Sequence, residues 1–466
     1  MSGSLIVALL GCRGLPAESP DVLASPPPLP TPALPPITTT TQPTPEQQIT
    51  AAAPAPSPVA PTPTFPGPQS APCGVLLPPL PAPADTDSDW APTDATRAAL
   101  RAQAPAVAWP ALQRLLDAPG TVGLVAFKAG QANEGVYLNA DRPMPLASMA
   151  KLITLVAYAE AVAAGELNPL EPVTLAELDR YYLPNFDLGA HRRAVGELRE
   201  SGRLLSPDAN PAATLDDVAW MMIRHSSNAA SDYLQLRLGQ EHIEQTAIAL
   251  GLGEPSGSHS APCTFLGQFL MMANHNRGSA NDRAILAGYT DNLDGAAAYG
   301  REVALLADAY RYQEAFRAAE QAWRADTRRP TIETQRYFAG RLAPQGTAGA
   351  YADLMLRLAQ NGLSDANSSF QARRILEWPN QFPANQELFS NVGYKNGSLP
   401  GVLTTAYYAY RWGDAAPVIV VLFYRDLPQQ TYRQWRFDLP HDELARWLLA
   451  DPAAIPALAA ALRDES

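Results

Sequence analysis

The spacing of hydrophobic residues predicts β-strands at both ends of the globular part of the chain. A β-branched and apolar run over residues 121–127 (TVGLVAF) predicts a buried strand, and residues 135–139 predict a second one after a turn. Near the C-terminus, runs rich in β-branched and aromatic residues predict strands over residues 389–395, 402–410 and 418–425. We expect the strands from the two ends of the domain to pair in one sheet.

Helical periodicity fills the region between these strands. The segment 148–165 places its apolar residues on one face, at Leu152, Leu155, Val156, Ala159 and Val162. Further helices are predicted over residues 96–116, 214–224, 301–324, 351–360 and 441–449, and from residue 230 onward. The sequence therefore predicts a mixed α/β fold of the α+β type. It has a mostly antiparallel sheet with flanking helices, an all-helical subdomain, and an active site in the cleft between them.

Residues 12–89 differ from the rest of the chain in composition. Of the 46 prolines, 23 fall within the first 83 residues, and no Lys or Arg occurs between Arg13 and Arg97. Such a segment buries too little apolar surface to offset the entropy lost on ordering. We expect a disordered, semi-extended tether over residues 12–89 and a globular domain over residues 90–466.

The N-terminal residues 4–12 read SLIVALLGC. This apolar run is too short to span a bilayer as a helix, and its end resembles a bacterial lipobox, in which the cysteine receives a lipid. No Lys or Arg precedes Cys12, although export signals carry positive charge there. We expect residues 1–11 to be a lipoprotein-type signal and Cys12 to anchor the chain to the outer side of a bacterial membrane. The alternative is an apolar N-terminus arising by chance.

The first candidate chemical motif is Ser148-Met149-Ala150-Lys151. The chain has only three lysines, Lys128, Lys151 and Lys395, beside many arginines. Residues three apart on a helix share a face, so the Ser148 hydroxyl and the Lys151 amine can touch. A serine hydroxyl needs a base to become nucleophilic, and a lysine amine with a lowered pKa can serve. Alone this spacing is weak evidence, because it also arises by accident.

Two further short motifs follow along the chain. Ser226 and Asn228 lie between two predicted helices, where a hydroxyl can relay a proton and an amide can bind a substrate peptide group. The segment from Lys395 to Ser398 (KNGS) follows a predicted strand, and its glycine permits a close approach by a ligand. Each motif also has an ordinary structural interpretation, a helix–helix turn for the first and a strand-ending turn for the second.

The three motifs together resemble the active-site set S-x-x-K, S-x-N and K-x-G of class A β-lactamases and penicillin-binding proteins. They occur in the same order and in the same predicted contexts, and two of the three lysines fall within them. The resemblance extends from about residue 96 to the C-terminus. It is most evident over residues 143–159 and 214–251.

This resemblance implies a role for each motif residue. Ser148 would be the nucleophile, Lys151 its base, and Ser226 the relay to the departing nitrogen, assisted by Lys395. Asn228 would bind the substrate side-chain amide, and the backbone N–H groups of Ser148 and Ser398 would form the oxyanion hole. The substrate-binding segment would comprise Asn228, Lys395, Asn396, Gly397 and Ser398.

The sequence departs from the family pattern in three respects. Asn396 occupies a position where the family has Thr or Ser, whose hydroxyl often contacts the substrate carboxylate. Ser398 is an alternative source of that hydroxyl. The E-x-x-L-N segment that carries the deacylating glutamate of class A enzymes is absent, and Glu254 is only the nearest acidic residue in that region. Helical insertions are predicted at about residues 167–211 and 266–341, with no function assigned to either.

Three functions are compatible with these observations. The first is a serine hydrolase that resembles class A β-lactamases and cleaves a β-lactam or related amide through an acyl-enzyme on Ser148. The second is a D,D-peptidase or penicillin-binding protein acting on peptidoglycan peptides, and the third is a non-catalytic cell-wall-binding lipoprotein. The net charge of −12 argues against nucleic acid as a partner. We expect neither a metal nor an organic cofactor, and the histidines and cysteines lack the spacing of metal ligands. We also expect a monomer.

Two cysteines remain once Cys12 is assigned to a lipid. Cys73 and Cys263 each follow the tripeptide Ser-Ala-Pro. Outside the cytoplasm they could form a disulfide that attaches the tether to the loop beyond the second motif. The alternative is two free thiols.

Overall fold

The computed structural model describes residues 69–71, 73, 75–77, 92–206, 208–252, 263–273, 282–325 and 330–463. The signal predicted over residues 1–11, the lipidation site Cys12 and most of the predicted tether lie outside these ranges, as does Glu254.

A five-stranded antiparallel sheet forms the centre of the domain, with strand order β4-β3-β11-β10-β9. The strands are β3 (Val122–Lys128), β4 (Val136–Leu138), β9 (Phe389–Leu399), β10 (Val402–Arg411) and β11 (Val418–Tyr424). The two ends of the domain meet where β3 pairs with β11, with Val125 opposite Val421. The predicted pairing of N-terminal and C-terminal strands is therefore correct, and the predicted fold class is confirmed.

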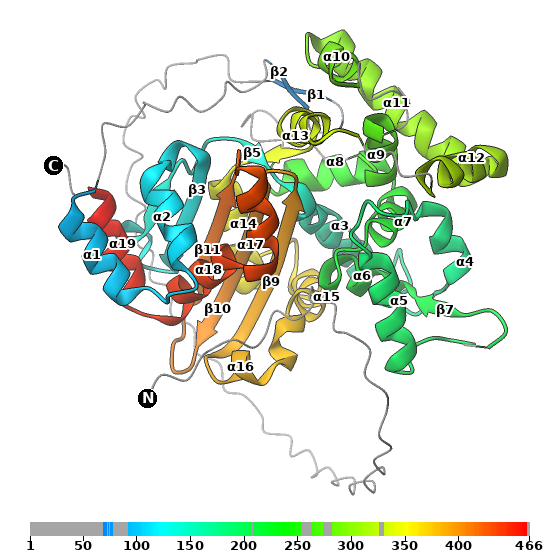
Figure 1. Cartoon of the computed structure of the whole chain (residues 1–466). Helices are drawn as coiled ribbons and strands as arrows, with labels where there is room; N and C mark the ends of the chain where they lie inside the picture. Colours follow the sequence, from blue (N-terminus) through cyan, green and yellow to red (C-terminus); the bar gives the residue numbers. More distant parts are fainter. Residues whose placement is uncertain are drawn as a thin grey trace, which may run out of the picture. The chain divides into compact units, whose positions relative to one another are not determined.

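The sheet is covered by helices on both faces, so every residue of its middle strand β11 is buried. In β11, Ile419, Val421 and Phe423 pack into one core, whereas the residues between them pack into another. This alternation follows from the two-residue period of a strand. One core lies beneath α2 (Trp109–Asp117), α18 (Pro440–Ala450) and α19 (Ala454–Arg463). The other joins the sheet to α14 (Ala348–Ala359) and the helical subdomain (Figure 1).

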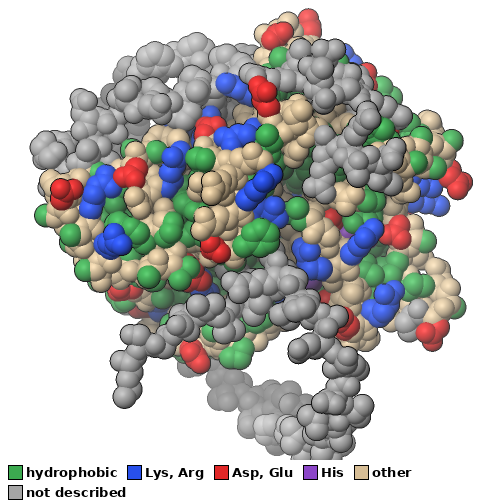
Figure 2. Space-filling model, in the orientation of Figure 1, with side chains coloured by type: hydrophobic (Ala, Val, Ile, Leu, Met, Phe, Trp, Pro, Cys, Tyr) green, Lys and Arg blue, Asp and Glu red, His purple; other side chains and the backbone are tan. Residues whose placement is uncertain are grey.

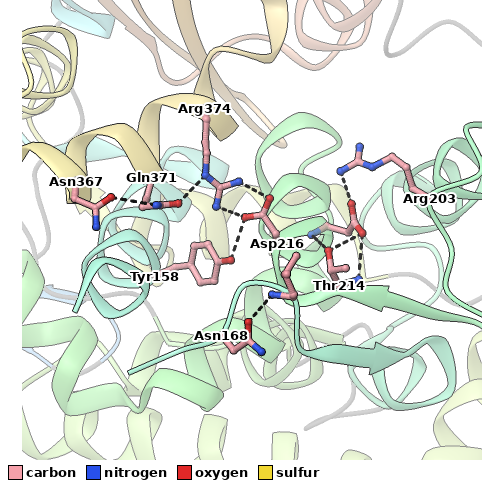
Figure 3. A network of polar contacts seen from close by, with 10 residues as sticks. Tyr158, Asn168, Arg203, Thr214, Asp216, Asn367, Gln371 and Arg374 are labelled. Carbon is pink, nitrogen blue, oxygen red and sulfur yellow. Dashed lines mark hydrogen bonds and ion pairs between the residues drawn. The ribbon is translucent and has the colours of Figure 1, made fainter. Parts of the chain in front are cut away.

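The helical subdomain places the segments that carry the first two motifs next to each other. It contains α3 (Lys151–Ala163), α6 (Leu215–Arg224), α7 (Asn228–Leu238), α8 (Gln240–Ala249) and α15 (Ala366–Leu376). Tyr158 on α3 donates a hydrogen bond to Asp216 on α6, and Arg374 on α15 binds both oxygens of that carboxylate (Figure 3). The network ties α3 to α6 and so stabilises the relative positions of Lys151 and the segment after α6.

Several helix predictions differ from the structure. The helix predicted over residues 96–116 is two helices, α1 (Asp94–Gln103) and α2, because Pro105 lacks the N–H that a continuous helix needs. The helix predicted over residues 301–324 is also two, α11 (Leu293–Tyr312) and α12 (Glu314–Ala325). The helices α15, α17 (Gln429–Asp438) and α19 were not predicted.

The two regions predicted as insertions contain further short elements. Residues 167–211 hold β6 (Pro172–Thr174), α4 (Leu175–Leu178), η6 (Asp179–Tyr181) and α5 (Ala190–Glu200). The later region holds α9 (Phe265–Ala273), α10 (Asp282–Gly288), α11, α12 and α13 (Ile332–Arg341). The later helices share a separate apolar core, which includes Phe269, Tyr299 and Phe338.

The part of the predicted tether that the structure describes is ordered. Residues Gln69–Ala71 and Val75–Leu77 form the antiparallel strands β1 and β2, and Cys73 between them is fully buried. Cys73 forms a disulfide with Cys263, as one of the two alternatives proposed. The tether prediction is therefore wrong for residues 69–71, 73 and 75–77, because a covalent bond and burial against the helical core offset the entropy lost on ordering.

We expect the Cys73→Ser/Cys263→Ser double variant to lose about 2–5 kcal/mol of unfolding free energy. The disulfide closes a loop spanning 190 residues, and such a link removes much of the entropy of the unfolded chain. Urea unfolding of the full chain, with and without the substitutions, measures this loss. Reduction of the wild-type protein should reproduce it, and a reductant-insensitive midpoint would contradict the expectation.

The described surface has a mixed character. Figure 2 shows basic and acidic side chains interspersed over the described part of one face. No single helix among the described residues is long and apolar enough to cross a membrane, although the bent pair α18–α19 together reaches that length and composition.

Candidate active site

The Ser148 motif lies in a tight turn between a short strand and a helix. The strand β5 (Met144–Pro145) leads into the 3₁₀ turn η5 (Ala147–Ala150), and α3 begins at Lys151. Ala147 has a φ of 49°, a left-handed conformation that costs energy for a residue with a Cβ. The turn leaves Ser148 partly exposed while Met149 and Ala150 are fully buried. The sequence thus folds to present one hydroxyl at the surface of a packed core.

The second motif lies in the short connection between α6 and α7. Ser226 has a φ of 63°, again left-handed. Ser227 caps α7, because its hydroxyl accepts a hydrogen bond from Ala230 N at 3.2 Å. Asn228 is the first residue of α7, so its side chain lies beside that of Ser226 at the start of the helix.

The third motif is part of strand β9, which continues to Leu399 instead of ending at Lys395 as predicted. Gly397 is buried against the Ser148 turn. A Cβ on Gly397 would lie 2.8 Å from Ser148 N and 2.6 Å from Leu146 O, closer than such atoms can approach. The glycine therefore lets β9 pass directly beside the backbone of the Ser148 turn.

Lys151 joins the first two motifs through its fully buried amine. Its Nζ donates to Ser226 O at 2.7 Å and to Asn228 Oδ1 at 2.6 Å, and both of these atoms can only accept hydrogen bonds. The hydroxyls of Ser148 and Ser226 each lie 3.2 Å from the same Nζ. A neutral amine has two N–H donors and one lone pair. The two carbonyl oxygens accept from both N–H groups, so the lone pair is left to accept from the hydroxyl of Ser148 or Ser226.

The electrostatic surroundings favour that neutral amine. Burial lowers the pKa of Lys151 to about 7, against the opposing attraction of the Asp232 and Asp187 carboxylates. Burial also raises the pKa of Asp232, which is fully enclosed on α7. The backbone N–H groups of Phe265 and Leu266 donate to its two oxygens at 2.8 and 2.7 Å, and they partly offset this rise.

The aromatic ring of Phe265 covers the buried amine. Its centroid lies 4.6 Å from Lys151 Nζ, and Asp232 fixes it there by accepting the Phe265 N–H. The first residue of α9 thus brings an apolar ring, and no acid, next to Lys151. Because α9 begins the later insertion, that insertion contributes directly to the site.

The remaining motif residues surround Ser226 and Ser148. Lys395 is buried, and its Nζ donates to Ser226 Oγ at 3.1 Å and to Asn396 O at 2.7 Å. Asn396 is partly exposed on β9, opposite Thr405 on β10. Ser398 Oγ lies 2.9 Å from the hydroxyl of Tyr432, a residue of α17. All eight residues assigned to catalysis or substrate binding from the sequence therefore lie in the three segments that meet at Ser148.

Four neighbours of this centre were not predicted from the sequence: Asp187, Asp232, Phe265 and Tyr432. Asp232 offered a signal, because it is an acid four residues after Asn228 on a helix that is otherwise mostly apolar. The other three lie far from the motifs in sequence and carried no recognisable signal. Among the described residues, no group of three or more His, Cys, Asp or Glu is arranged to hold a metal ion.

A sheet and a helical subdomain with a Ser–Lys pair at their junction define a fold of the serine β-lactamase type. A family model described as the β-lactamase enzyme family matches residues 108–436, and the chain belongs to this family.

Solved structures with similar folds include β-lactamases and a penicillin-binding protein. A β-lactamase from Sphaerobacter thermophilus shares 18% identity, with 78% of this chain and 100% of that chain covered and a TM-score of 0.42. A β-lactamase from Chitinophaga pinensis shares 15%, covering 79% and 99%, with a TM-score of 0.42. The protein PBP-A shares 14%, covering 69% and 89%, with a TM-score of 0.38. No curated protein sequence matches the chain.

Proposed function

We propose that the protein is a serine hydrolase in which Ser148 attacks the carbonyl of a β-lactam or a related peptide amide and becomes acylated. The observation that carries this proposal is the environment of Lys151. Its pKa is lowered to about 7, two of its hydrogen-bonding positions are occupied by carbonyl oxygens, and its third faces hydroxyls. A base with a pKa near the working pH combines availability of the lone pair with sufficient basicity.

The proposed steps follow from the contacts. Lys151 Nζ takes the proton of Ser148 Oγ as that oxygen bonds to the substrate carbonyl carbon. In this proposal the N–H groups of Ser148 and Ser398 stabilise the negative charge on the carbonyl oxygen. The support is that Gly397, which precedes Ser398, passes close to Ser148 N. When the C–N bond breaks, Ser226 gives its proton to the nitrogen and is reprotonated by Lys151.

The substrate contacts in this proposal come from the side chains that remain available. Asn228 Oδ1 accepts from Lys151, so its amide N–H₂ is directed to a substrate carbonyl. Lys395 supplies positive charge beside Ser226, where it suits a substrate carboxylate and stabilises the hydroxyl during proton transfer.

A long-lived acyl-enzyme is the version of this function that the structure favours. An apolar ring, that of Phe265, covers Lys151 Nζ at 4.6 Å. Both oxygens of Asp232 accept backbone N–H groups, and those of Asp187 accept from Gly189 N and His191 N. These two acids are thus committed to structure, as expected for a D,D-peptidase or penicillin-binding protein more than for a fast β-lactamase.

Stopped-flow kinetics with a chromogenic cephalosporin tests this proposal on the full chain. We expect a burst of about one equivalent of product per enzyme, followed by turnover at least a hundredfold slower than the burst, because the two described acids near Lys151, Asp232 and Asp187, are bonded to backbone N–H groups and do not act as a base. Sustained turnover at the burst rate would instead establish a β-lactamase with another deacylating base. The absence of both burst and turnover would favour the non-catalytic alternative.

A further inference from the structure

A cavity of about 1000 Å³ is lined by residues of both insertions and by none of the eight motif residues. Its wall includes Asn185 and five residues of α5, with Gln321 contributed by α12 of the later insertion. Its volume is that of a site for a ligand of several residues or rings. The two insertions, which contribute no strand to the five-stranded sheet, therefore both contribute residues to one cavity.

One face of α5 is turned toward the cavity. The helix contributes His191, Arg192, Val195, Gly196 and Arg199, and spacings of three and four residues within this set keep it on one side of the helix. A Cβ on Gly196 would meet no atom within 4 Å, so this part of the helix borders open space. The hollow is thus deepened where the helix lacks a side chain.

The charged groups of the wall give it an excess of positive charge. Arg192 and Arg199 are exposed, and neither guanidinium group forms a hydrogen bond or ion pair within the described part of the chain. The Arg192 guanidinium lies over the Tyr182 ring, 5.7 Å from its centroid. The acid in the wall, Asp179, lies 3.4 Å from Nε2 of His191. The two guanidinium groups are therefore free to bind anionic oxygens in the forked geometry that suits a carboxylate.

His191 is a buried polar side chain in the wall of this cavity. It is 2% exposed, and its Nε2 is buried without a hydrogen-bond partner, although Asp179 lies nearby. Its Nδ1 lies 3.0 Å from Ser227 Oγ, the cap of α7 between Ser226 and Asn228. One side chain thus contacts both the cavity and the second catalytic motif.

The two insertions hold the cavity open by direct bonds. Tyr310 on α11 donates to Tyr182 O at 2.8 Å, and Arg311 donates to the Tyr181 hydroxyl at 3.0 Å. The Gln321 side chain, which lines the cavity, donates to Tyr310 at 3.2 Å. These contacts fix α12 against the first insertion, so the wall is formed by a packed structure.

We propose that this cavity binds a carboxylate-bearing peptide, namely a second segment of the polymeric cell-wall substrate. Arginines recognise carboxylates, and the amides of Asn185, Asn210 and Gln321 suit the N–H and C=O groups of a peptide. The identity of the ligand rests on the proposed function, whereas the anionic site rests on the cavity itself. Binding here would hold a long substrate close to Ser148 through two attachment points.

Isothermal titration of the full-length Ser148→Ala protein tests this proposal without requiring catalysis. The probes are a stem tetrapeptide with free carboxylates, the same peptide with its carboxylates amidated, and citrate. We expect the free peptide to bind and the amidated peptide to bind at least roughly tenfold more weakly, since a charge-assisted hydrogen bond is lost. Citrate binding as tightly as the peptide would overturn the peptide assignment.

Variants of the wall separate this cavity from the catalytic centre. Gly196→Phe, which fills the open space, and Arg192→Gln/Arg199→Gln should each weaken peptide binding by roughly tenfold or more. Arg180→Gln is the matched control, because Arg180 is exposed in the same insertion but does not line the cavity. Unchanged binding in both wall variants would overturn the proposal. With Ser148 present, the wall variants should keep the wild-type rate of acylation by a small β-lactam, so a failure of the proposed function would be seen separately.

Discussion

Replacement of Lys151 by Gln should lower the rate of Ser148 acylation by roughly 10²–10⁴, the usual contribution of a general base. Glutamine retains polar contacts at this position but has no basic lone pair. In the wild-type protein Lys151 Nζ lies 3.2 Å from Ser148 Oγ and can take its proton, whereas a glutamine amide cannot. The rate of burst formation with a chromogenic cephalosporin measures the effect.

The wild-type pH profile should carry the same signature. Lys151 accepts a proton only when it is neutral, and its pKa is about 7. Acylation should therefore rise as the pH increases through about 7, and this limb should vanish in Lys151→Gln. Lys128→Gln is the matched control, because it removes a lysine that is ion-paired with Asp414 at 2.8 Å on the far end of β3. Equal losses in the two variants would contradict the assignment of Lys151.

Substitution of Gly397 by Ala should lower acylation by roughly 10²–10³, the loss expected when an oxyanion donor is misplaced. The added Cβ would lie 2.5 Å from Thr404 Oγ1, as well as within 2.8 Å of two backbone atoms of the Ser148 turn. Since backbone cannot rotate away as a side chain can, β9 must move from the turn. The N–H groups of Ser148 and Ser398 would then no longer point to one oxygen.

The matched control for this change is Gly340→Ala. Gly340 lies in helix α13, and a Cβ there would meet no atom within 4 Å. It should keep the wild-type rate and melting temperature, whereas Gly397→Ala should also lose about 1–3 kcal/mol of stability from overpacking. Wild-type acylation by Gly397→Ala would show that β9 does not need its close approach to Ser148.

The sheet and the three motif segments could be predicted because their determinants are local in sequence. The runs that became β3 and β11 are apolar over most of their length, so burial follows from their composition alone. Ser148 and Lys151 are three residues apart, so their contact follows from helical geometry even though the turn proved to be 3₁₀ before α3. The scarcity of lysine made Lys151 and Lys395 conspicuous.

The rest of the site depends on contacts that no local pattern encodes. Phe265 reaches Lys151 from an insertion 114 residues further along, and Asp232 fixes it through backbone N–H groups. Cys73 is ordered in a proline-rich segment only because Cys263 and a buried core hold it. Long-range packing of this kind overrides composition, which is why the tether prediction failed at residues 69–71, 73 and 75–77.

Mass spectrometry of the full chain after incubation with penicillin G tests the central claim, acylation of Ser148, most directly. We predict a mass increase equal to one intact penicillin, because ring opening by Ser148 retains every atom of the β-lactam. Peptide mapping should place the adduct on the peptide that contains Ser148, and the Ser148→Ala variant should show none. An adduct that persists in Ser148→Ala, or no adduct in a folded wild-type protein, would contradict the account.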